Sequence, residues 1–228
     1  MFDLLGSLRG PLRAFSWIAA RTPFYDDLIT ESLDAGIRQV VIIGPGYDAR
    51  AWRLAREGVR FVEVDHPATQ VRKTALAPSG GPTYVAADLS VQRLRDVLTS
   101  PVTTSEPMVL ICEGLTYFLA EADVRSLLSE AAEVAPQGSR LGVDFGAPAR
   151  DLPLRWRLPV AIGKLWQGWT REPIRFWLHP ENAARFLAET GWSSAEVLTH
   201  ADLHERFLRG TDIPSPPPIG SYACKAAK

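Results

Sequence analysis

The sequence is poor in the residues that hold metals or disulfides, and it has almost no excess charge. Its 228 residues include two cysteines and four histidines, at no spacing that suggests a zinc site. Cys112 and Cys224 fall in expected strands, so we expect buried, reduced thiols and no disulfide. The net charge of −1 argues against a broad nucleic-acid-binding surface, which usually needs a strong basic excess.

An uninterrupted apolar run long enough to cross a membrane is also missing. The first 20 residues are apolar, but Arg9 and Arg13 interrupt them, so we reject a membrane span. Asp3 precedes the apolar part, whereas a signal peptide has a basic start. We therefore expect a cytoplasmic protein in which residues 1–20 form an amphipathic cap helix. A content of 46% hydrophobic residues is enough for one domain, residues 1–228, with a large core.

Short apolar runs alternate with helix-like stretches from about residue 22 to residue 145. The expected strands are 38–43, 60–65, 84–89, 108–112 and 140–145. The expected helices are 26–35, 49–56, 67–77, 91–98 and 121–135. This alternation predicts an α/β fold in which right-handed crossovers join parallel strands, with helices on both faces of the sheet.

The rhythm breaks after the fifth expected strand. Residues 147–178 hold four tryptophans among arginines, and we interpret them as a small helical lid over the ligand-binding edge of the sheet. A helix at 180–190 follows, and 194–199 and 220–226 would be the last two strands. Their connection is rich in proline and has no clear helix, which favours an antiparallel hairpin at the sheet edge. The prediction is thus a Rossmann-like, mostly parallel sheet of seven strands.

Glycines and acids follow the expected strands, at the edge where open α/β sheets bind ligands. In chain order they are Gly44, Gly46, Asp65, Asp88, Glu113 and Asp144. The glycine turn would let the backbone approach a bulky ligand. Asp65 lies about twenty residues further on, the spacing of a carboxylate that accepts hydrogen bonds from a ribose. Asp88 could accept from an adenine amino group and Leu89 could pack on the ring, which indicates a nucleoside-containing cofactor.

Each of these residues also has a purely structural interpretation. Gly44 and Gly46 could serve only a tight turn, and Asp65 and Asp88 could each be a helix N-cap. Glu113 could pair with an arginine in a buried ion pair. A set of such residues at successive strand ends favours the cofactor site over coincidence.

Several motifs resemble the leucine carboxyl methyltransferase family, especially its bacterial members in polyketide and other small-molecule pathways. The matching text lies at Arg21-Thr22-Pro23 with Asp26, at 39–54 around Gly44-Pro45-Gly46-Tyr47-Asp48, at Glu63-Val64-Asp65-His66-Pro67 with Gln70 and Lys73, at Ala87-Asp88-Leu89, and at 113–119. The resemblance covers roughly residues 20–145. It implies the class I methyltransferase fold and S-adenosylmethionine as methyl donor.

The family pattern also implies how the donor is held. Arg21 would bind its carboxylate, since a guanidinium fits a carboxylate bidentately. Glu113 would accept from its amino group, and the Gly44–Gly46 turn would contact its amino-acid portion. Asp65 would hold the ribose, and Asp88 and Leu89 would contact the adenine. Pro45 departs from the pattern and removes a backbone N–H from the turn. Few residues precede Arg21, so we expect a lid that is reduced or completed by a partner subunit, as in a homodimer.

The acceptor is less defined by sequence than the donor. A carboxylate acceptor needs no base, whereas a hydroxyl acceptor needs one within hydrogen-bond reach. Tyr117 and Asp144 are the candidate catalytic residues, and His66 and His179 are more easily explained as structural. We predict O-methylation of a small carboxylate or hydroxyl compound, in secondary metabolism, with no metal, nucleic acid or membrane involved.

The sequence is also compatible with two other functions. A nicotinamide dinucleotide oxidoreductase would use the same Gly-x-Gly-x-x-Ala turn and the acid of the second strand. Glu113-Gly114 and the absence of a Tyr-x-x-x-Lys pair speak against it. The other alternative is a fold relative that binds the cofactor without transferring a methyl group.

Overall fold

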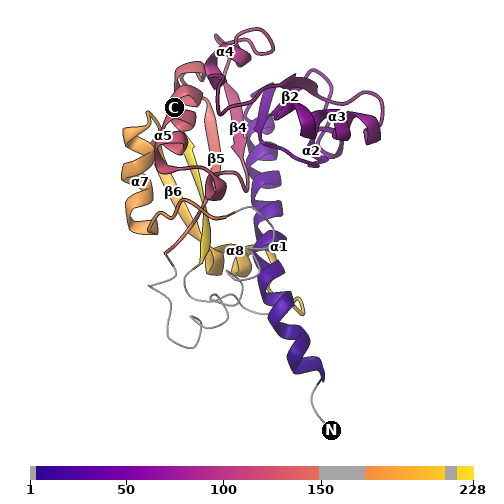
Figure 1. The fold of residues 1–228 in the computed structure, drawn as a ribbon, viewed down its shortest axis with the longest axis vertical. Coiled ribbons are helices and arrows are strands. Elements are labelled where there is room, and N and C mark those ends of the chain that lie inside the picture. The colour runs from indigo at the N-terminus through magenta and orange to yellow at the C-terminus, as the bar shows by residue number, and fades with distance from the viewer. Residues whose placement is uncertain (1–3, 149–172, 214–219) are drawn as a thin grey trace.

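The protein is built on one sheet, shown in Figure 1, a computed structural model that describes residues 4–148, 173–213 and 220–228, with side chains from residue 16 onward. The strand order is β3-β2-β1-β4-β5-β7-β6. The strands are β1 (Gln39–Ile43), β2 (Arg60–Asp65), β3 (Thr83–Ala86), β4 (Met108–Cys112), β5 (Arg140–Gly146), β6 (Ser193–Thr199) and β7 (Ser221–Ala227). Neighbouring strands are parallel, except that β7 runs antiparallel to both β5 and β6. The predicted mostly parallel sheet with an antiparallel edge hairpin is confirmed.

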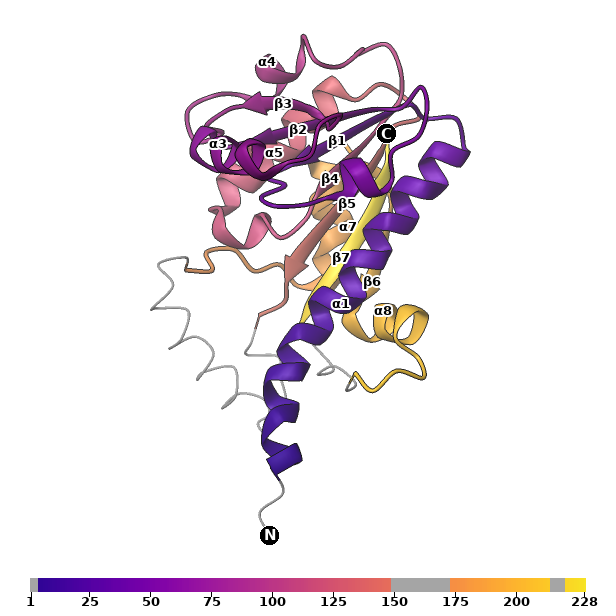
Figure 2. The ribbon, with the colours of Figure 1, turned by 90° about the vertical axis from the view of Figure 1, so that its right-hand side faces the viewer.

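Helices cover both faces of this sheet (Figure 2). They are α1 (Leu4–Asp34), α2 (Arg50–Arg53), α3 (Pro67–Leu76), α4 (Leu94–Leu98), α5 (Glu121–Val134), α7 (Pro180–Glu189) and α8 (His200–Phe207), with a short 3₁₀ helix η1 (Thr116–Phe118). One buried cluster joins the sheet to α1 and α8, and the other joins it to α4, α5 and α7. Because side chains alternate along a strand, Val40 and Ile42 belong to the first cluster, while Val41 and Ile43 belong to the second.

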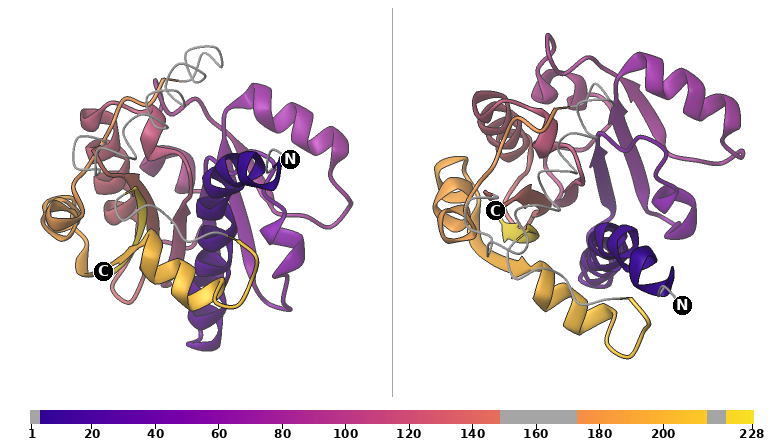
Figure 3. Two further views of the ribbon diagram at one scale, coloured as in Figure 1. Left: turned by 90° about the horizontal axis from the view of Figure 1, so that it is seen from below. Right: turned by 60° about the horizontal axis from the view of Figure 1, so that its bottom comes forward.

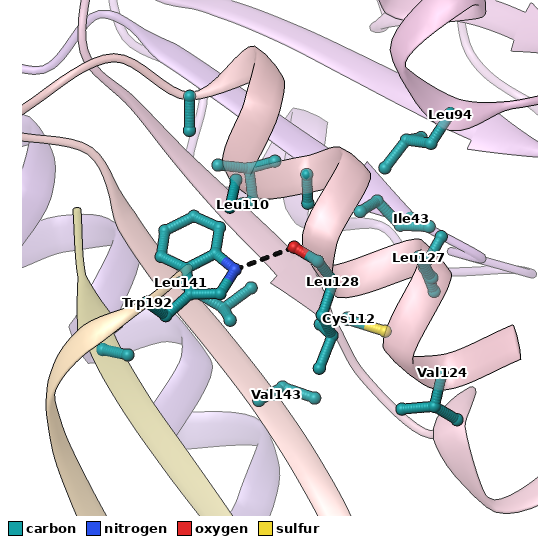
Figure 4. Close-up of a cluster of buried hydrophobic side chains, with 14 of the residues drawn as sticks. Ile43, Leu94, Leu110, Cys112, Val124, Leu127, Leu128, Leu141, Val143 and Trp192 are labelled. Atoms are coloured by element: carbon teal, nitrogen blue, oxygen red, sulfur yellow. Dashed lines mark hydrogen bonds between the residues drawn. The ribbon is translucent and has the colours of Figure 1, made fainter. Parts of the chain in front are cut away.

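The core between β4, β5 and α5 is closed by a tryptophan just before β6 (Figure 4). Trp192 is 1% exposed, and its indole N–H donates to the carbonyl of Leu128 at 3.0 Å. The hydrogen bond satisfies the one polar atom of a large apolar side chain. Cys112 and Cys224 are both buried free thiols, as expected.

The first helix differs from its prediction. The expected cap helix at 1–20 and the expected helix at 26–35 are one continuous helix, α1, with Pro23 inside it. A proline inside a helix removes one backbone hydrogen bond. Here the buried face runs past it without interruption, through Trp17, Ala20, Phe24 and Leu28, so packing against the sheet maintains the helix.

The expectation that no helix joins the last two strands was wrong. Helix α8 begins with a capping box in which Thr199 accepts from the N–H of Asp202 and the Asp202 carboxylate accepts from the N–H of Thr199. Its buried Leu203 faces α1, beside which α8 lies in Figure 3. An ion pair between Arg206 and Asp27, at 2.9 Å, joins the two helices.

Other boundaries shift by a few residues in ways that matter for the site. Strand β3 ends at Ala86, so Asp88 and Leu89 follow the strand instead of belonging to it. Helix α2 spans only Arg50–Arg53 of the expected 49–56. Most of the predicted lid, 147–178, lies outside the described residues.

Candidate functional site

The turn after β1 has a backbone that suits glycine. Gly44 and Gly46 have φ angles of +64° and +53°, in the left-handed region that other residues rarely adopt. A Cβ built on Gly44 would lie 3.1 Å from Cδ2 of Leu115, whereas one on Gly46 would meet nothing within 4 Å. Gly44 therefore also allows a close approach between the turn and the segment after β4.

Asp65, at the end of β2, is fixed by the same turn. Its Oδ2 accepts the N–H of Gly46 at 2.7 Å, and its Oδ1 accepts the N–H of His66 at 2.6 Å. The N-cap of α3 is His66, whose Nδ1 accepts from the N–H of Ala68, so Asp65 does not serve as that cap. A carboxylate has about four acceptor positions, so Asp65 retains capacity for a ligand's hydroxyl groups.

Asp88 lies beyond β3 and makes a local turn. Its Oδ1 accepts from both the N–H and the hydroxyl of Ser90, and these bonds lower the pKa of the Asp88 carboxyl. The side chain is 40% exposed and lies 3.9 Å from Nε2 of His66. The N-cap of α4 is Arg93, so Asp88 holds a turn and is not the helix N-cap that the sequence also allowed, and it lines a cavity.

That cavity, of about 530 Å³, lies between the ends of β1, β2 and β3 and the helix α5. Its lining includes Gly44, Asp65, Asp88, Leu89 and Leu115. Four predicted site residues therefore line one space, which offers both carboxylates and leucines. Such a lining suits a nucleoside, whose base is flat and apolar on its faces and whose ribose carries hydroxyls.

A second cavity, of about 260 Å³, lies on the other side of the glycine turn. It is lined by Arg21, Arg50, Glu113 and Gly44, among others, so it brings both signs of charge to a small space. Gly44 borders both cavities. A single ligand with a nucleoside at one end and a zwitterionic group at the other would match this pair of spaces across Gly44.

Glu113, at the end of β4, is held by two arginines. Its Oε1 accepts from Nε of Arg21 at 2.8 Å, and its Oε2 accepts from Nη1 of Arg50 at 2.5 Å. Burial raises the pKa of the Glu113 carboxyl, while Arg50 and Arg21 act in the opposite direction. The ion-pair interpretation of Glu113 is therefore realised at the wall of the smaller cavity.

Asp144, at the end of β5, is fully buried and organises the segment after β4. Its carboxylate accepts from the N–H of Gly114 at 2.7 Å, from Nη1 of Arg21 at 2.9 Å and from the hydroxyl of Tyr117 at 3.1 Å. Burial raises the pKa of the Asp144 carboxyl, and Arg21 counteracts this. Asp144 thus acts on its surroundings through these three donors.

Tyr117, in η1, is only 8% exposed. Burial raises the pKa of its phenol well above the ordinary value, and the nearby Asp144 raises it further. The proton of the phenol is directed to Asp144, so Tyr117 is a hydrogen-bond donor and a poor base.

Arg21 is placed by α1 between Glu113 and Asp144. Burial lowers the pKa of its guanidinium, but Asp144 and Glu113 raise it by more, so the group stays charged. The two bonds described above use two of its five N–H groups. The guanidinium therefore keeps donors for a further anionic group.

Arg50 is the site residue that the sequence analysis missed. Its side chain is 4% exposed, and it binds three acidic groups: Asp26 at 2.7 Å, Asp48 at 2.6 Å and Glu113. The signal was present, because Asp26, Asp48 and Arg50 all lie within the motifs quoted above. Spacing alone did not reveal that α1, the glycine turn and the end of β4 meet at one guanidinium.

The described residues offer no candidate metal site and no candidate membrane span. Among them, no group of three or more His, Cys, Asp or Glu side chains could hold a metal ion. Likewise, no helix in the described part of the chain is long and apolar enough to cross a membrane.

Comparison with known proteins gives consistent matches. Residues 8–132, more than half of the chain, match the sequence model of the leucine carboxyl methyltransferase family. A putative S-adenosyl-L-methionine-dependent methyltransferase of Parafrankia sp. (strain EAN1pec) is 29% identical over 98% of this chain and 71% of its own length. A protein of the same description from Frankia alni is 30% identical over 92% of this chain and 73% of its own length. A putative methyltransferase from Thermobifida fusca YX, a solved structure, has a TM-score of 0.66 and 18% identity, over 96% of this chain and 83% of that one.

Proposed function

The chain belongs to the leucine carboxyl methyltransferase family, and we propose that it methylates an oxygen atom, preferably of a carboxylate, on a small-molecule acceptor. Membership makes it an S-adenosylmethionine-dependent methyltransferase with the class I fold. What we propose is which class of acceptor is methylated and which residues bind the donor.

The observation that carries the donor assignment is the pair of cavities that meet at Gly44. S-adenosylmethionine has an adenosine at one end and an amino acid at the other. The larger cavity offers the carboxylates of Asp65 and Asp88 and the side chain of Leu89. The smaller cavity offers an arginine and a glutamate, which match a carboxylate and an ammonium. The residues present therefore fit the donor.

In this proposal each predicted residue has one task. Asp65 accepts from the ribose hydroxyls, Asp88 accepts from the adenine amino group, and Leu89 packs on the ring. Arg21 binds the donor's carboxylate with its remaining N–H groups, and Glu113 accepts from its ammonium. The glycine turn supplies room between them.

When bound, S-adenosylmethionine supplies a methyl group on a sulfonium, whose neutral thioether leaving group needs no protonation. The chain therefore has to bind and orient the two reactants, and such positioning can supply about 7–11 kcal/mol of the barrier. Asp144 supports this by fixing both Arg21 and the turn at Gly114. Its own carboxylate is buried, so in the proposal it is a positioning residue.

Two buried side chains, Tyr117 and Asp144, bear on the chemical class of the acceptor. A hydroxyl acceptor needs a base, but Tyr117 holds its proton, and Asp144 is fully buried and lines neither cavity. A carboxylate is already ionised at neutral pH and needs no base. The two side chains therefore favour a carboxylate acceptor over a hydroxyl compound.

The test uses the purified chain, tritiated methyl donor and two matched acceptor panels, one of small carboxylic acids and one of phenols and alcohols. We expect labelled methyl esters and stoichiometric S-adenosylhomocysteine from the first panel. Transfer only to hydroxyls would contradict the acceptor class. Thermal stabilisation by NAD and not by S-adenosylhomocysteine would favour the nicotinamide alternative, and donor binding without transfer to any acceptor would favour a non-methylating relative.

Two finer parts of the proposal need separate measurements. A role in secondary metabolism is tested by deleting the gene and comparing metabolite profiles for a missing methyl ester. A homodimer that completes the lid is tested by light scattering of the protein with and without S-adenosylhomocysteine. A monomer that turns over at the same specific rate at all concentrations would exclude the second idea.

A further inference from the structure

We propose that Arg50 is a positioning residue for the methyl donor, which keeps Glu113 ionised and oriented at the wall of the smaller cavity. The inference rests on the proposed function, because it assumes that Glu113 accepts from the donor's ammonium. It adds a second arginine, on a different element from Arg21, to the residues that set donor affinity.

Arg50 joins three segments that are far apart in the sequence. Its Nε donates to Asp26 of α1, and its Nη1 donates to both Asp48 of the glycine turn and Glu113 at the end of β4. Its Nη2 donates to the carbonyl of Thr22 at 3.2 Å. The guanidinium also lies 5.5 Å from the centre of the Tyr25 ring. A planar group with these contacts has one available orientation, which fixes the Glu113 carboxylate as well.

The two arginines are not equivalent partners of Glu113. Arg21 is shared with Asp144, which is fully buried and has a strong claim on the same cation. Arg50 is shared with Asp26 and Asp48, which are 21% and 13% exposed and partly solvated. Removal of Arg50 would leave Glu113 with a cation that a second buried carboxylate also needs. The ionised form of Glu113 should then become harder to maintain.

The charged and titratable groups around Glu113 all bear on this argument. On α1 they are Arg21 and Tyr25, on α2 Arg50, in the turn Asp48, and on β5 Asp144. Burial and Asp144 raise the pKa of Glu113, while Arg50 and Arg21 lower it. Without Arg50 the balance moves toward the protonated acid, which cannot accept a full ion pair from an ammonium.

Arg53 provides a matched control. It also pairs with Asp26 and lines the same cavity. Its side chain is 48% exposed, and its Nη1 and Nη2 both donate to Asp26 and not to Glu113. Substitution of Arg53 therefore changes the charge of the cavity wall by the same amount without touching Glu113.

The experiment is calorimetric titration of the full chain with S-adenosylmethionine and S-adenosylhomocysteine between pH 6 and pH 8.5. The variants are Arg50→Met, Arg50→Lys, Arg53→Met, Glu113→Gln and the double variant Arg50→Met/Glu113→Gln. We expect Arg50→Met to weaken donor binding roughly ten- to hundredfold, the range of a lost charge-assisted hydrogen bond. We also expect the affinity of Arg50→Met, relative to that of wild type and of Arg53→Met at the same pH, to fall further as the pH is lowered.

Two readouts separate positioning from mere packing. In Arg50→Lys the cation remains but the fork is lost, so affinity should fall while the pH profile stays like that of wild type. In the Glu113→Gln background, Arg50→Met should have little additional effect, because both changes act on one interaction. The donor's own amine titrates equally in every variant, so differences between profiles report on the protein.

The outcomes that overturn the inference are distinct. Equal affinities and pH profiles for Arg50→Met and Arg53→Met, or additive losses in the double variant, would refute it while wild-type binding upholds the proposed function. If circular dichroism shows that Arg50→Met is unfolded, Arg50→Lys carries the test, and wild-type affinity in that variant refutes the inference. Failure of the wild type to bind either ligand would overturn the proposed function and this inference together.

Discussion

Gly46 donates its backbone N–H to Oδ2 of Asp65 at 2.7 Å, so the turn after β1 and the acid at the end of β2 form one rigid unit. The hydrogen bond turns the carboxylate toward the larger cavity, which Asp65 and Gly44 line together. A glycine motif and a distant acid that are usually described separately are therefore one structural element here.

The first prediction follows from that bond. Asp65→Asn keeps the shape but replaces one acceptor oxygen with an N–H₂ group, which cannot accept from both Gly46 and His66. We expect S-adenosylhomocysteine affinity to fall roughly ten- to hundredfold, as for loss of a charge-assisted hydrogen bond. Calorimetry measures this, with Asp123→Asn, on α5 at the same cavity, as the control that should bind normally. Normal affinity in Asp65→Asn would remove the residue from the site.

The second prediction compares the two glycines of the turn. Alanine at either position would adopt a left-handed backbone, at a cost of roughly 1–2 kcal/mol. Gly44→Ala should cost more than Gly46→Ala, because only its Cβ meets Leu115. It should also weaken ligand binding more, since Leu115 lines the larger cavity. Urea unfolding and calorimetry of the two variants check both statements, and equal effects would show that the contact with Leu115 is unimportant.

The third prediction concerns Tyr117. Tyr117→Phe removes the hydroxyl that donates to Asp144, so the free energy of unfolding should fall by about 1 kcal/mol. The rate of methyl transfer to a carboxylate acceptor should change less than about tenfold, which is below the 10²–10⁴-fold contribution typical of a general base. Steady-state kinetics at saturating donor provides the measurement. A drop of a thousandfold in kcat with unchanged donor affinity would establish Tyr117 as a base.

The fourth prediction concerns acid stability. His200 is the first residue of α8 and contacts α1, where Oγ of Ser16 is 3.2 Å from its Nε2 and the Trp17 ring packs edge-on against it. Burial lowers the pKa of His200 to about 4 from 6.5; the bond to Ser16 opposes this, and the charge of His204 adds to it. The unfolded chain therefore binds more protons than the folded one between these two values, and stability is lost as the pH falls through that window. The loss at this residue amounts to ~3 kcal/mol at most.

His200→Gln should flatten the pH dependence of the unfolding free energy between pH 4 and pH 6.5. His204→Gln, on the same helix but half-buried, serves as the comparison: it removes only the charge of His204, so it should change the slope less than His200→Gln does. Denaturant titrations at several pH values give these slopes directly. Identical slopes for wild type and His200→Gln would show that another group controls acid unfolding.

The sequence was most informative where a local pattern and the global fold agree. The apolar run before Gly44 and the acids after the strands predicted the central sheet and several of the residues that line the two cavities. The family resemblance predicted the donor, which residue patterns alone had left open against a dinucleotide. These features are readable because buried parallel strands are continuous apolar runs and their carboxyl ends share one edge.

What was missed depends on contacts between distant segments. The helices expected at 1–20 and 26–35 are one helix, and only packing against the sheet shows why α1 continues through Pro23. The contacts of Asp144, a candidate catalytic residue, with Arg21, Gly114 and Tyr117 also join distant segments, and no local pattern predicted them. Arg50 looked like one arginine among many until three acids from three elements were found around it. Capping boxes such as Thr199 with Asp202 are readable in principle, but the helix that follows is short and only weakly apolar.

The position of β7 has a consequence for how the protein is made. This strand, Ser221–Ala227, lies between β5 and β6, and its register pairs Cys224 with both Val143 and Val197. While the chain is still on the ribosome, β6 has no neighbour to join until the last strand has left the exit tunnel. Strands β1 to β5 can assemble during synthesis, so the part of the sheet that borders the two cavities should be protected from proteases earlier than the edge hairpin.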